Sequence, residues 1–292
     1  MNKIIHFSFI GGDLRQKSVM CSLANDGHKV CSFGFSKQLL SDAPFIICSP
    51  NLEECVKHAD VVILPLPYGK EDYLNAPFSD DKIHTSDLLR CMDDKQLLFA
   101  GKVDERLKTL AALYNLHPID YMEREELAVC NAIPTAEGAL EIAMSETPYT
   151  LHGANCLVIG YGRIGKILSK DLQALGAYTY IAARKHADLA WIKANAMIPV
   201  PLPVLEHFID IFDIIFNTAP APLLDYKRLS LLQKDCLVID LASPPGGVDF
   251  EAAGQLGRKV IKALSLPGKV APNTAGEIIK DTIVNILEEL GV

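Results

Sequence analysis

The stretch Asn155–Lys185, NCLVIGYGRIGKILSKDLQALGAYTYIAARK, carries the strongest signal for the fold class of this chain. An apolar run of strand length, Cys156–Ile159, leads directly into the motif Gly-x-Gly-x-x-Gly at residues 160–165. The pattern of Arg163–Leu175 predicts a helix, and Tyr178–Ala182 is predicted as a second strand. A strand, a glycine loop, a helix and a second strand in this order are typical of a dinucleotide-binding unit, whereas the glycine motif alone is weak evidence for one. We therefore predict a Rossmann domain in the second half of the chain.

Each glycine of the motif has a distinct part in the predicted cofactor site. Gly160 permits the tight turn, Gly162 lets a pyrophosphate approach the backbone, and Gly165 lets helix and strand pack closely. Arg163 and Ile164 begin the helix, whose free N–H groups and dipole attract phosphate. The alternative is a glycine-rich turn without a ligand.

The turn after the second strand predicts NADP rather than NAD as the cofactor. A chain that binds NAD usually carries an acid about 20 residues after the glycine motif, where it receives the ribose 2′-hydroxyl. Here Ala183, Arg184 and Lys185 stand in that region. An uncharged residue followed by two cations suits a 2′-phosphate, because a guanidinium binds it bidentately and a carboxylate would repel it. A solvated basic turn is the alternative.

Two later strand ends add polar or small residues to the predicted cofactor site. Asn217 and Thr218 end one strand, and Ala242 and Ser243 follow another. Ligands of open α/β sheets lie beyond the carboxyl ends of the strands, so these residues are predicted to line the cleft. Taken singly, each segment is equally compatible with an ordinary turn.

Apolar runs alternate with helical patterns along the whole chain, which predicts an α/β protein with two doubly wound domains. We expect an N-terminal substrate domain at 1–131, a connecting helix at 132–150, the Rossmann domain at 151–272, and a C-terminal helix at 273–292 that packs back on the first domain. The expected strands are Ile4–Ile10, Lys29–Phe33, Ala59–Leu64, Gln96–Ala100 and His117–Tyr121 in the first domain and Cys156–Ile159, Tyr178–Ala182, Ile211–Asn217, Cys236–Leu241 and Lys259–Ala263 in the second. The helical segment around the connector is expected to break at Ile133-Pro134, since proline resists a helix interior.

Composition and charge exclude several classes of protein. The net charge is −8, so no global basic field is expected to draw the chain to nucleic acid or anionic lipid. No apolar stretch approaches the roughly 18 residues of a membrane span and no secretory signal is recognised, so we expect a cytoplasmic protein. The 8 cysteines and 8 histidines lack metal-ligand spacing, which predicts buried free thiols and no metal site.

The layout resembles that of the D-2-hydroxyacid and alanine dehydrogenases, in which a Rossmann domain lies between parts of a catalytic domain. Those enzymes polarise a substrate carbonyl with a His and hold the substrate carboxylate with an Arg. Leu266–Pro272 and Asp240–Pro244 stand where these two residues are expected, and neither segment contains them. The resemblance therefore implies the fold and argues against the ordinary hydroxyacid mechanism.

Several phrases spread over both halves carry a more specific resemblance. They are GGDLRQ at 11–16, LPLP at 64–67, NAIPTAEGA at 131–139, GYGRIG at 160–165, LPGKVAP at 266–272 and TAG at 274–276. The set resembles the family of dipicolinate synthase A subunits, which implies oxidation of a dihydrodipicolinate-type ring, made from a lysine-pathway precursor, to pyridine-2,6-dicarboxylate. It also implies a flavoprotein-like B subunit and expression in the mother cell during sporulation. We expect the chain itself to form a homo-oligomer.

A substrate with two carboxylates needs cations and N–H donors, and five residues are predicted to serve it. Asp13 and Arg15 follow the first strand, Lys102 follows a later one, and Thr135 and Glu137 begin the connecting helix. For each residue the alternative is structural: a solvated first-turn side chain, a helix cap or a surface charge.

Three functions stay open on the sequence. The first is an NADP-dependent oxidoreductase subunit that forms dipicolinate by removing hydride from a dihydropyridine-type ring. The second is an NADP-dependent hydroxyacid or amino-acid dehydrogenase. The third is a regulatory subunit that binds NADP without doing chemistry, an interpretation favoured by the lack of an obvious acid–base residue.

Overall fold

The computed structural model describes residues 4–292, and the chain divides into two compact units. Unit 1 combines the N-terminal segment up to Cys130 with the C-terminal segment Ala271–Val292, and unit 2 is the continuous segment Asn131–Val270. Each unit is built around its own parallel sheet and its own buried core.

The sheet of unit 1 has six parallel strands in the order β3-β2-β1-β4-β7-β8. They are β1 (His6–Ile10), β2 (Lys29–Phe33), β3 (Ile46–Cys48), β4 (Val61–Ile63), β7 (Leu97–Ala100) and β8 (Ile119–Asp120). A hairpin of β5 (Gly69–Lys70) and β6 (Tyr73–Leu74) lies outside this sheet. The strand order reverses between β1 and β4, which is where doubly wound sheets bind ligands.

Helices cover both faces of this sheet. They are α1 (Leu14–Asn25), α2 (Leu52–Val56), α3 (Thr85–Cys91), α4 (Glu105–Ala112), the 3-10 turn η1 (Tyr121–Glu123), α5 (Glu125–Cys130) and α12 (Pro272–Glu289). Phe7 and Phe9 of β1 pack on the side of α1, α5 and α12, whereas Ile10 packs on the side of α2, α3 and α4. Because successive strand residues point to opposite faces, β1 contributes to both layers of the core.

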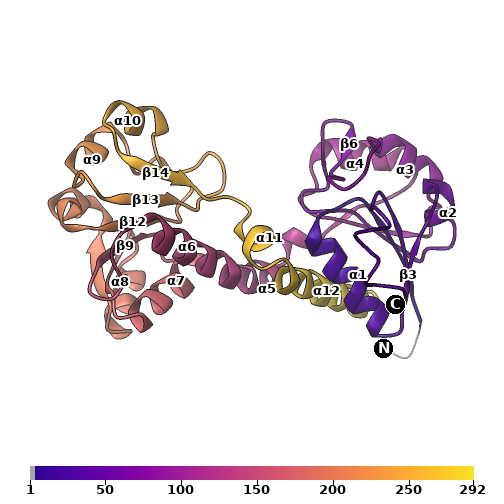
Figure 1. The fold of residues 1–292 in the computed structure, drawn as a ribbon, viewed down its shortest axis with the longest axis horizontal. Helices are drawn as coiled ribbons and strands as arrows, with labels where there is room; N and C mark the ends of the chain where they lie inside the picture. Colours follow the sequence, from indigo (N-terminus) through magenta and orange to yellow (C-terminus); the bar gives the residue numbers. More distant parts are fainter. Residues whose placement is uncertain (1–3) are drawn as a thin grey trace. The chain divides into compact units, whose positions relative to one another are not determined.

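The C-terminal helix α12 lies alongside α1, as Figure 1 shows. Its residues Ile279, Ile283 and Leu287 recur every fourth position and are buried in the core of unit 1. At its far end, the Arg124 guanidinium donates to both carboxylate oxygens of Glu289 at 2.7 and 2.5 Å. The predicted return of the final helix to the first domain is confirmed.

The sheet of unit 2 repeats the same topology, with six parallel strands in the order β11-β10-β9-β12-β13-β14. The strands are β9 (Asn155–Ile159), β10 (Tyr178–Ala183), β11 (Ile198–Pro201), β12 (Ile214–Asn217), β13 (Leu237–Asp240) and β14 (Lys259–Lys262). The helices are α6 (Ala132–Glu146), α7 (Arg163–Ala174), α8 (His186–Ala194), α9 (Tyr226–Leu231), α10 (Phe250–Gln255) and α11 (Leu266–Val270), with 3-10 turns η2 (Leu202–His207) and η3 (Ile209–Ile211). The predicted fold class, two doubly wound α/β domains with the second a Rossmann domain, is confirmed.

Four strands, β3, β5, β6 and β11, were not predicted from the sequence, and one predicted strand begins later than expected. The edge strands β3 and β11 were not expected, since β3 is short and β11 contains Pro199 and Pro201, which a central strand would not tolerate. The strand expected at Ile211–Asn217 begins only at Ile214, because Ile209–Ile211 forms a 3-10 turn.

The predicted helix break at Ile133-Pro134 is wrong. The helical segment is interrupted at Asn131 instead, and α6 runs through Pro134, which lies in its first turn. N–H groups in the first turn have no intrahelical acceptor, so a proline there removes no hydrogen bond. The proline therefore marks the start of the helix rather than its interruption.

Candidate functional site

The glycine loop lies at the carboxyl edge of the unit 2 sheet, where the strand order reverses between β9 and β12. Gly160 has a φ of +102°, and a Cβ there would lie 2.5 Å from Thr218 Oγ1. A Cβ on Gly165 would overlap the Gly160 carbonyl oxygen, so α7 packs directly on the loop. A Cβ on Gly162 would meet no atom of residues 4–292 within 4 Å. The fold itself thus requires Gly160 and Gly165, whereas the space beside Gly162 is available to a ligand.

The first helix after each switch point begins differently in the two units. In unit 1 the Asp13 carboxylate accepts from the N–H groups at the start of α1, including that of Arg15 at 2.9 Å, and Gln16 bonds back to the Asp13 N–H. In unit 2 the N-cap of α7 is Gly162, which has no side chain of its own to cap the helix. The start of α7 can therefore receive an anion, while a carboxylate already occupies the start of α1.

A cleft of about 500 Å³ opens beside the glycine loop, within the range of ligand sites. Its walls come from the glycine loop, the end of β10, the start of α8 and the loop after β12; they are Ile159, Gly160, Tyr161, Gly162, Lys166, Ala182, Ala183, Arg184, Lys185, Asp188, Leu202, Ala219, Pro220, Ala221 and Leu223. Arg163, Ile164 and Gly165 form the first turn of α7, and Ile164 packs on the core.

The turn after β10 supplies two cations to the cleft. Ala183 is buried at the end of the strand, and Arg184 and Lys185 are exposed. Within residues 4–292, neither of these two side chains has a hydrogen bond or an ion pair. The acid in the cleft wall is Asp188, in the first turn of α8. With Lys166 included, three cations face one carboxylate, so the cleft suits an anionic ligand.

The glycine loop and α7 bring an aromatic ring and a cation together in the cleft wall. Lys166 Nζ lies 5.6 Å from the centroid of the Tyr161 ring. Burial raises the pKa of the Tyr161 phenol, a hydrogen bond with Asn195 opposes the shift, and Asp188 adds to it. The phenol therefore stays neutral and offers a flat surface at the cleft.

A buried polar pair joins the ends of β12 and β13. Asn217 and Asp240 are both fully buried, and Asn217 Nδ2 donates to Asp240 Oδ1 at 2.7 Å. Thr218 Oγ1 donates to the Ile159 carbonyl at 2.9 Å, which holds the glycine loop to the neighbouring strand. Asn217 and Thr218 thus brace the loops of the cleft rather than line it.

The segment after β13 is anchored on the same carboxylate. The Ala242 N–H donates to Asp240 Oδ1 at 3.3 Å, and the Gly247 N–H donates to Oδ2 at 3.4 Å. Ala242 is buried and Ser243 is exposed, and neither belongs to the cleft wall. Asp240 is the anchoring residue that the site prediction did not include.

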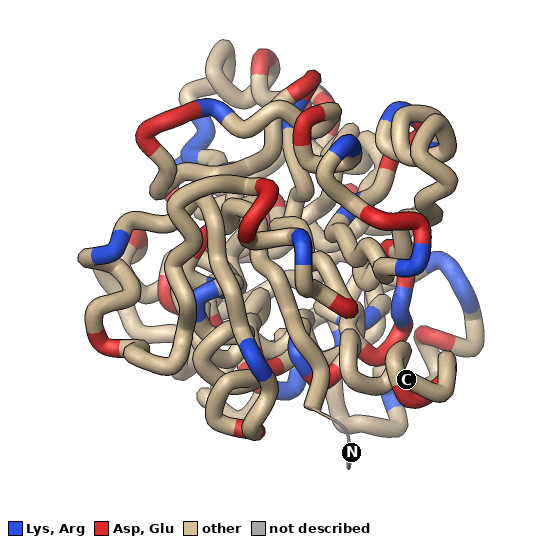
Figure 2. The backbone as a smooth tube through the Cα atoms, turned by 90° about the vertical axis from the view of Figure 1, so that its right-hand side faces the viewer, with Lys and Arg blue, Asp and Glu red and all other residues tan. Residues whose placement is uncertain are grey.

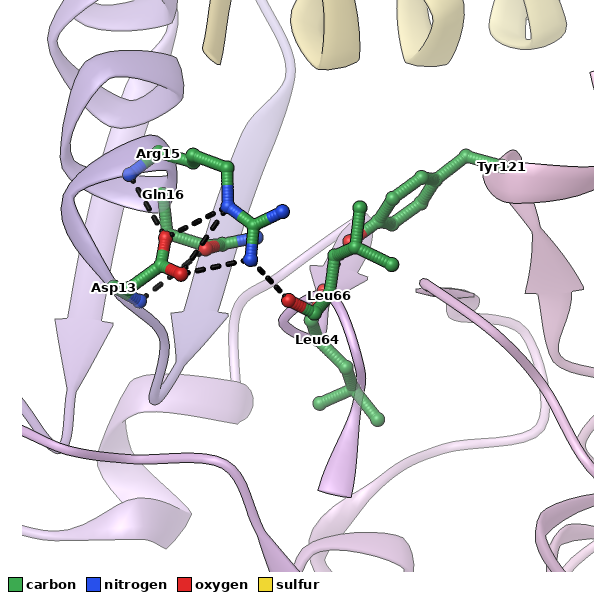
Figure 3. Close-up of polar contacts among 6 residues, drawn as sticks. All are labelled: Asp13, Arg15, Gln16, Leu64, Leu66 and Tyr121. Carbon is green, nitrogen blue, oxygen red and sulfur yellow. Dashed lines mark hydrogen bonds and ion pairs between the residues drawn. The ribbon is translucent and has the colours of Figure 1, made fainter. Parts of the chain in front are cut away.

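Asp13 and Arg15 form a polar network at the carboxyl edge of the unit 1 sheet (Figure 3). Arg15 Nη2 donates to Asp13 Oδ2 at 2.7 Å, and Arg15 Nε donates to Oδ1 at 3.0 Å. Nη2 also donates to the Leu66 carbonyl in the loop after β4. The Arg15 side chain is only 9% exposed, so it ties the start of α1 to that loop.

Tyr121 completes this network from the other side of the β4 loop (Figure 3). Its hydroxyl donates to the Leu64 carbonyl at 3.0 Å, and the side chain is fully buried. Burial raises the pKa of Tyr121 above its ordinary value, and the nearby Arg15 opposes this shift. Two side chains therefore fix carbonyls of the loop between Leu64 and Leu66.

The other three predicted substrate residues lie in different surroundings. Lys102 is exposed after β7 with a φ of +65°, and its N–H donates to Asp120 Oδ1 at 3.0 Å. In unit 2, Thr135 Oγ1 donates to the Asn131 carbonyl at 2.7 Å. Glu137 is exposed on α6 near Asp171, whose pKa is raised by burial and further by this neighbour. Asp13 and Arg15 are the pair that the structure joins directly.

Comparison with known proteins identifies the family. The family model for the N-terminal domain of the dipicolinate synthase A subunit matches residues 6–122. The A subunit of dipicolinate synthase from Bacillus subtilis (strain 168) is 32% identical over 289 residues, which cover 98% of this chain and 97% of that protein. The chain belongs to the family of dipicolinate synthase A subunits.

Solved structures agree with this family and with the fold. The crystal structure of the dipicolinate synthase A subunit from Bacillus halodurans superimposes with a TM-score of 0.89 at 32% identity, covering 97% of each chain. An L-alanine dehydrogenase matches with a TM-score of 0.65 at 17% identity, covering 97% of this chain and 90% of that one. The resemblance to the dipicolinate synthase A subunits is confirmed. The resemblance to the alanine dehydrogenases is confirmed at the level of the fold.

Residues of both charge signs are spread along the chain of this family member. Figure 2 shows acidic and basic residues interspersed along the backbone. Among the helices that the structure describes, none combines the length and apolar character that a bilayer crossing needs. Within residues 4–292, no three His, Cys, Asp or Glu side chains gather as metal ligands would.

Proposed function

We propose that this chain is an NADP-dependent oxidoreductase subunit that forms dipicolinate from a dihydrodipicolinate-type precursor. Loss of hydride and a proton turns the dihydropyridine ring into the aromatic pyridine-2,6-dicarboxylate, and the nicotinamide of NADP⁺ accepts the hydride when bound. The observation that carries the proposal is the glycine loop before α7, whose central Gly162 brings no capping side chain and leaves room for a pyrophosphate. Membership of the dipicolinate synthase family supports the dicarboxylate product.

The preference for NADP over NAD is proposed to come from Arg184 and Lys185. Both side chains are exposed at the cleft and lack internal partners within the described residues, so they are available to a 2′-phosphate. Asp188 in the same cleft would oppose a phosphate, but two cations outweigh one carboxylate. We expect NADP(H) to bind at least about tenfold more tightly than NAD(H), a difference of about 1.4 kcal/mol.

Titration of both cofactors by calorimetry or fluorescence tests this preference. Arg184→Ala should remove most of it and leave NAD affinity nearly unchanged. Lys193→Ala is the matched control, because it removes a cation from the helix α8 that follows this turn without touching the cleft. The preference should also shrink as salt rises, since screening shortens from about 10 Å at 0.1 M to about 3 Å at 1 M. Equal affinities in the wild type would refute the assignment.

Of the residues predicted from the sequence, the two cations of unit 1, Arg15 and Lys102, are proposed to bind the substrate carboxylates. Arg15 is the central cation, since the bonds it makes to Asp13 and Leu66 use Nε and Nη2 and leave Nη1 for a ligand. Lys102 supplies a second, exposed cation after β7. Asp13 orients the guanidinium by its paired bonds.

Arg15→Ala is expected to lower kcat/KM for substrate by roughly 10–150-fold, because a charge-assisted hydrogen bond contributes about 1.5–3 kcal/mol. NADP affinity should stay normal, since the cofactor cleft belongs to unit 2. Lys17→Ala is the control on the same helix, where the lysine pairs with Asp42 at 2.8 Å. A melting curve of each variant separates loss of binding from loss of fold. Normal activity of a folded Arg15→Ala protein contradicts the assignment.

The complete enzyme is proposed to include a flavoprotein-like B subunit and to act in the cytoplasm of the mother cell of a sporulating bacterium, with this chain as a homo-oligomer. The residues described above include no side chain placed as an obvious acid or base for the whole reaction, which supports a need for the partner. Dipicolinate formation should require both subunits, and the two should co-purify. Full turnover by this chain with NADP and substrate alone counts against the two-subunit scheme. NADP binding without hydride transfer in a single turnover, even with the partner present, favours a regulatory role.

A further inference from the structure

The helix α2 is too short to cover its side of the unit 1 sheet. It has 5 residues, which span about 7–8 Å at 1.5 Å per residue, whereas β1 and β2 have 5 residues each and span about 16 Å. A hollow of about 350 Å³ remains over β1, β2 and the edge strand β3. This hollow lies in unit 1 and is separate from the NADP cleft of unit 2.

The sheet register brings one residue from each of three strands to the hollow. Ser8 of β1 pairs with Cys31 of β2, which pairs in turn with Ile47 of β3. Residues paired across neighbouring parallel strands point to the same face, so these side chains form one row. All three line the hollow, and Cys31 is half-buried there.

A second thiol from α2 faces this row. Cys55 also lines the hollow and is buried, and Cys31 packs against the core cluster that contains it. The Ser8 hydroxyl donates to the Cys55 carbonyl at 2.5 Å, which fixes the helix over the strands. Two cysteines that are 24 residues apart in the sequence (55 − 31 = 24) therefore meet beside an accessible space.

The two thiols differ in their environment. A hydrogen bond from Cys55 lowers the pKa of Cys31, burial opposes this, and the Ser32 and Ser49 backbones add to the lowering. The bond to Cys31 and burial raise the pKa of Cys55. Cys31 is therefore the thiol that ionises first, and the thiolate is the nucleophile in disulfide exchange.

We propose that this hollow is a thiol modification site, in which Cys31 reacts with small organic disulfides and Cys55 resolves the product. The Cys31 thiolate attacks one sulfur of R–S–S–R, so that a Cys31–S–S–R bond forms and R–S⁻ leaves. Cys55 then loses its proton to solvent and attacks Cys31 Sγ, which releases a second R–S⁻ and leaves a Cys31–Cys55 disulfide. The two thiols are oxidised and the small disulfide is reduced to two thiols.

The experiment treats the full chain with 2-hydroxyethyl disulfide at neutral pH and follows each cysteine by peptide mass spectrometry. We expect the Cys31–Cys55 linked peptide in the wild type and a trapped mixed disulfide on Cys31 in Cys55→Ser. Cys31→Ser should give neither product. The exposed Cys130 is the internal control, and Cys31 should react several-fold faster despite its lower exposure.

Faster reaction at Cys130 than at Cys31, or a wild type without the linked peptide, overturns the proposal. The wild-type measurement needs no variant, so a Cys55→Ser protein that fails to fold does not weaken the test. NADP titration of the oxidised protein should give an unchanged affinity, because the hollow and the cofactor cleft lie in different units. A tenfold loss of NADP affinity on oxidation would instead indicate general damage to the chain and count against a local site.

Discussion

Replacing Gly165 by alanine is expected to weaken both the fold of unit 2 and its cofactor binding. The added Cβ would overlap the Gly160 carbonyl oxygen, which is a backbone atom of the loop and cannot rotate away. Forcing an extra carbon into a packed contact costs about 1–3 kcal/mol. At roughly 2–4 °C per kcal/mol, the melting temperature should fall by about 2–12 °C. Because relief of the overlap moves the start of α7 away from the loop, we expect NADP to bind at least about tenfold more weakly, or 1.4 kcal/mol.

Two matched glycine variants separate the effect on the fold from the effect on the ligand. Gly162→Ala places its Cβ where no atom of residues 4–292 lies within 4 Å, so the melting temperature should change little while NADP affinity falls about tenfold or more. Gly254→Ala in α10 also meets no described atom, and it should leave binding intact and stabilise by up to about 1 kcal/mol. Differential scanning fluorimetry and calorimetric titration of the three variants are the assays. A Gly162→Ala protein that binds NADP like the wild type would falsify the placement of the pyrophosphate.

Two further predictions concern unit 1. Ile283→Ala in α12 should lower the free energy of unfolding of this unit by about 2–5 kcal/mol in chemical denaturation, because the side chain is fully buried. Ile283→Val should lower it by only about 0.5–1.5 kcal/mol. Equal effects of the two variants would contradict the packing of this helix. Burial lowers the pKa of His28, with Asp26 opposing, and its Nδ1 accepts from the Ile5 N–H at 3.2 Å, so the neutral ring is favoured in the fold. The contribution of His28 to stability is therefore present at a pH above its ordinary pKa near 6.5, and it is lost as the pH falls through the lowered pKa of the folded state. Melting curves from pH 8 to 5 should show a steeper loss of stability in acid for wild type than for His28→Asn.

The sequence predicted the parts of the fold that have a strong local signal. The glycine motif, its flanking strands and the apolar stripe of the last helix each have a periodicity or spacing that only one arrangement satisfies. The edge strands β3 and β11 were missed because they are short and because Pro199 and Pro201 are tolerated only at an edge, a position that the sequence does not reveal.

The hydrogen bonds that hold the predicted site in place could not be predicted from the sequence, because they join residues of different strands and loops. The Asn217–Asp240 bond follows from β12 and β13 being neighbours, which becomes known only with the strand order. The bond from Arg15 to the Leu66 carbonyl likewise joins loops after β1 and β4. A local signal was present for the start of α1, since Asp13 and Gln16 stand at capping-box spacing. That spacing would have assigned Asp13 to a helix cap before any role toward substrate.

The two units show how one topology can carry two kinds of site. Both sheets have the same strand order, and in both a helix follows the first strand at the point where that order reverses. The difference lies at the helix start: Asp13 brings a carboxylate onto the N–H groups of α1, whereas Gly162 brings none to α7. A phosphate at α1 would have to displace a carboxylate that is also paired with Arg15, and it would meet that negative charge at close range. Unit 1 is therefore unsuited to a second dinucleotide. Arg15 lies at its switch point, and the donor Nη1, which its bonds to Asp13 and Leu66 do not use, is the group that we propose binds a smaller carboxylate.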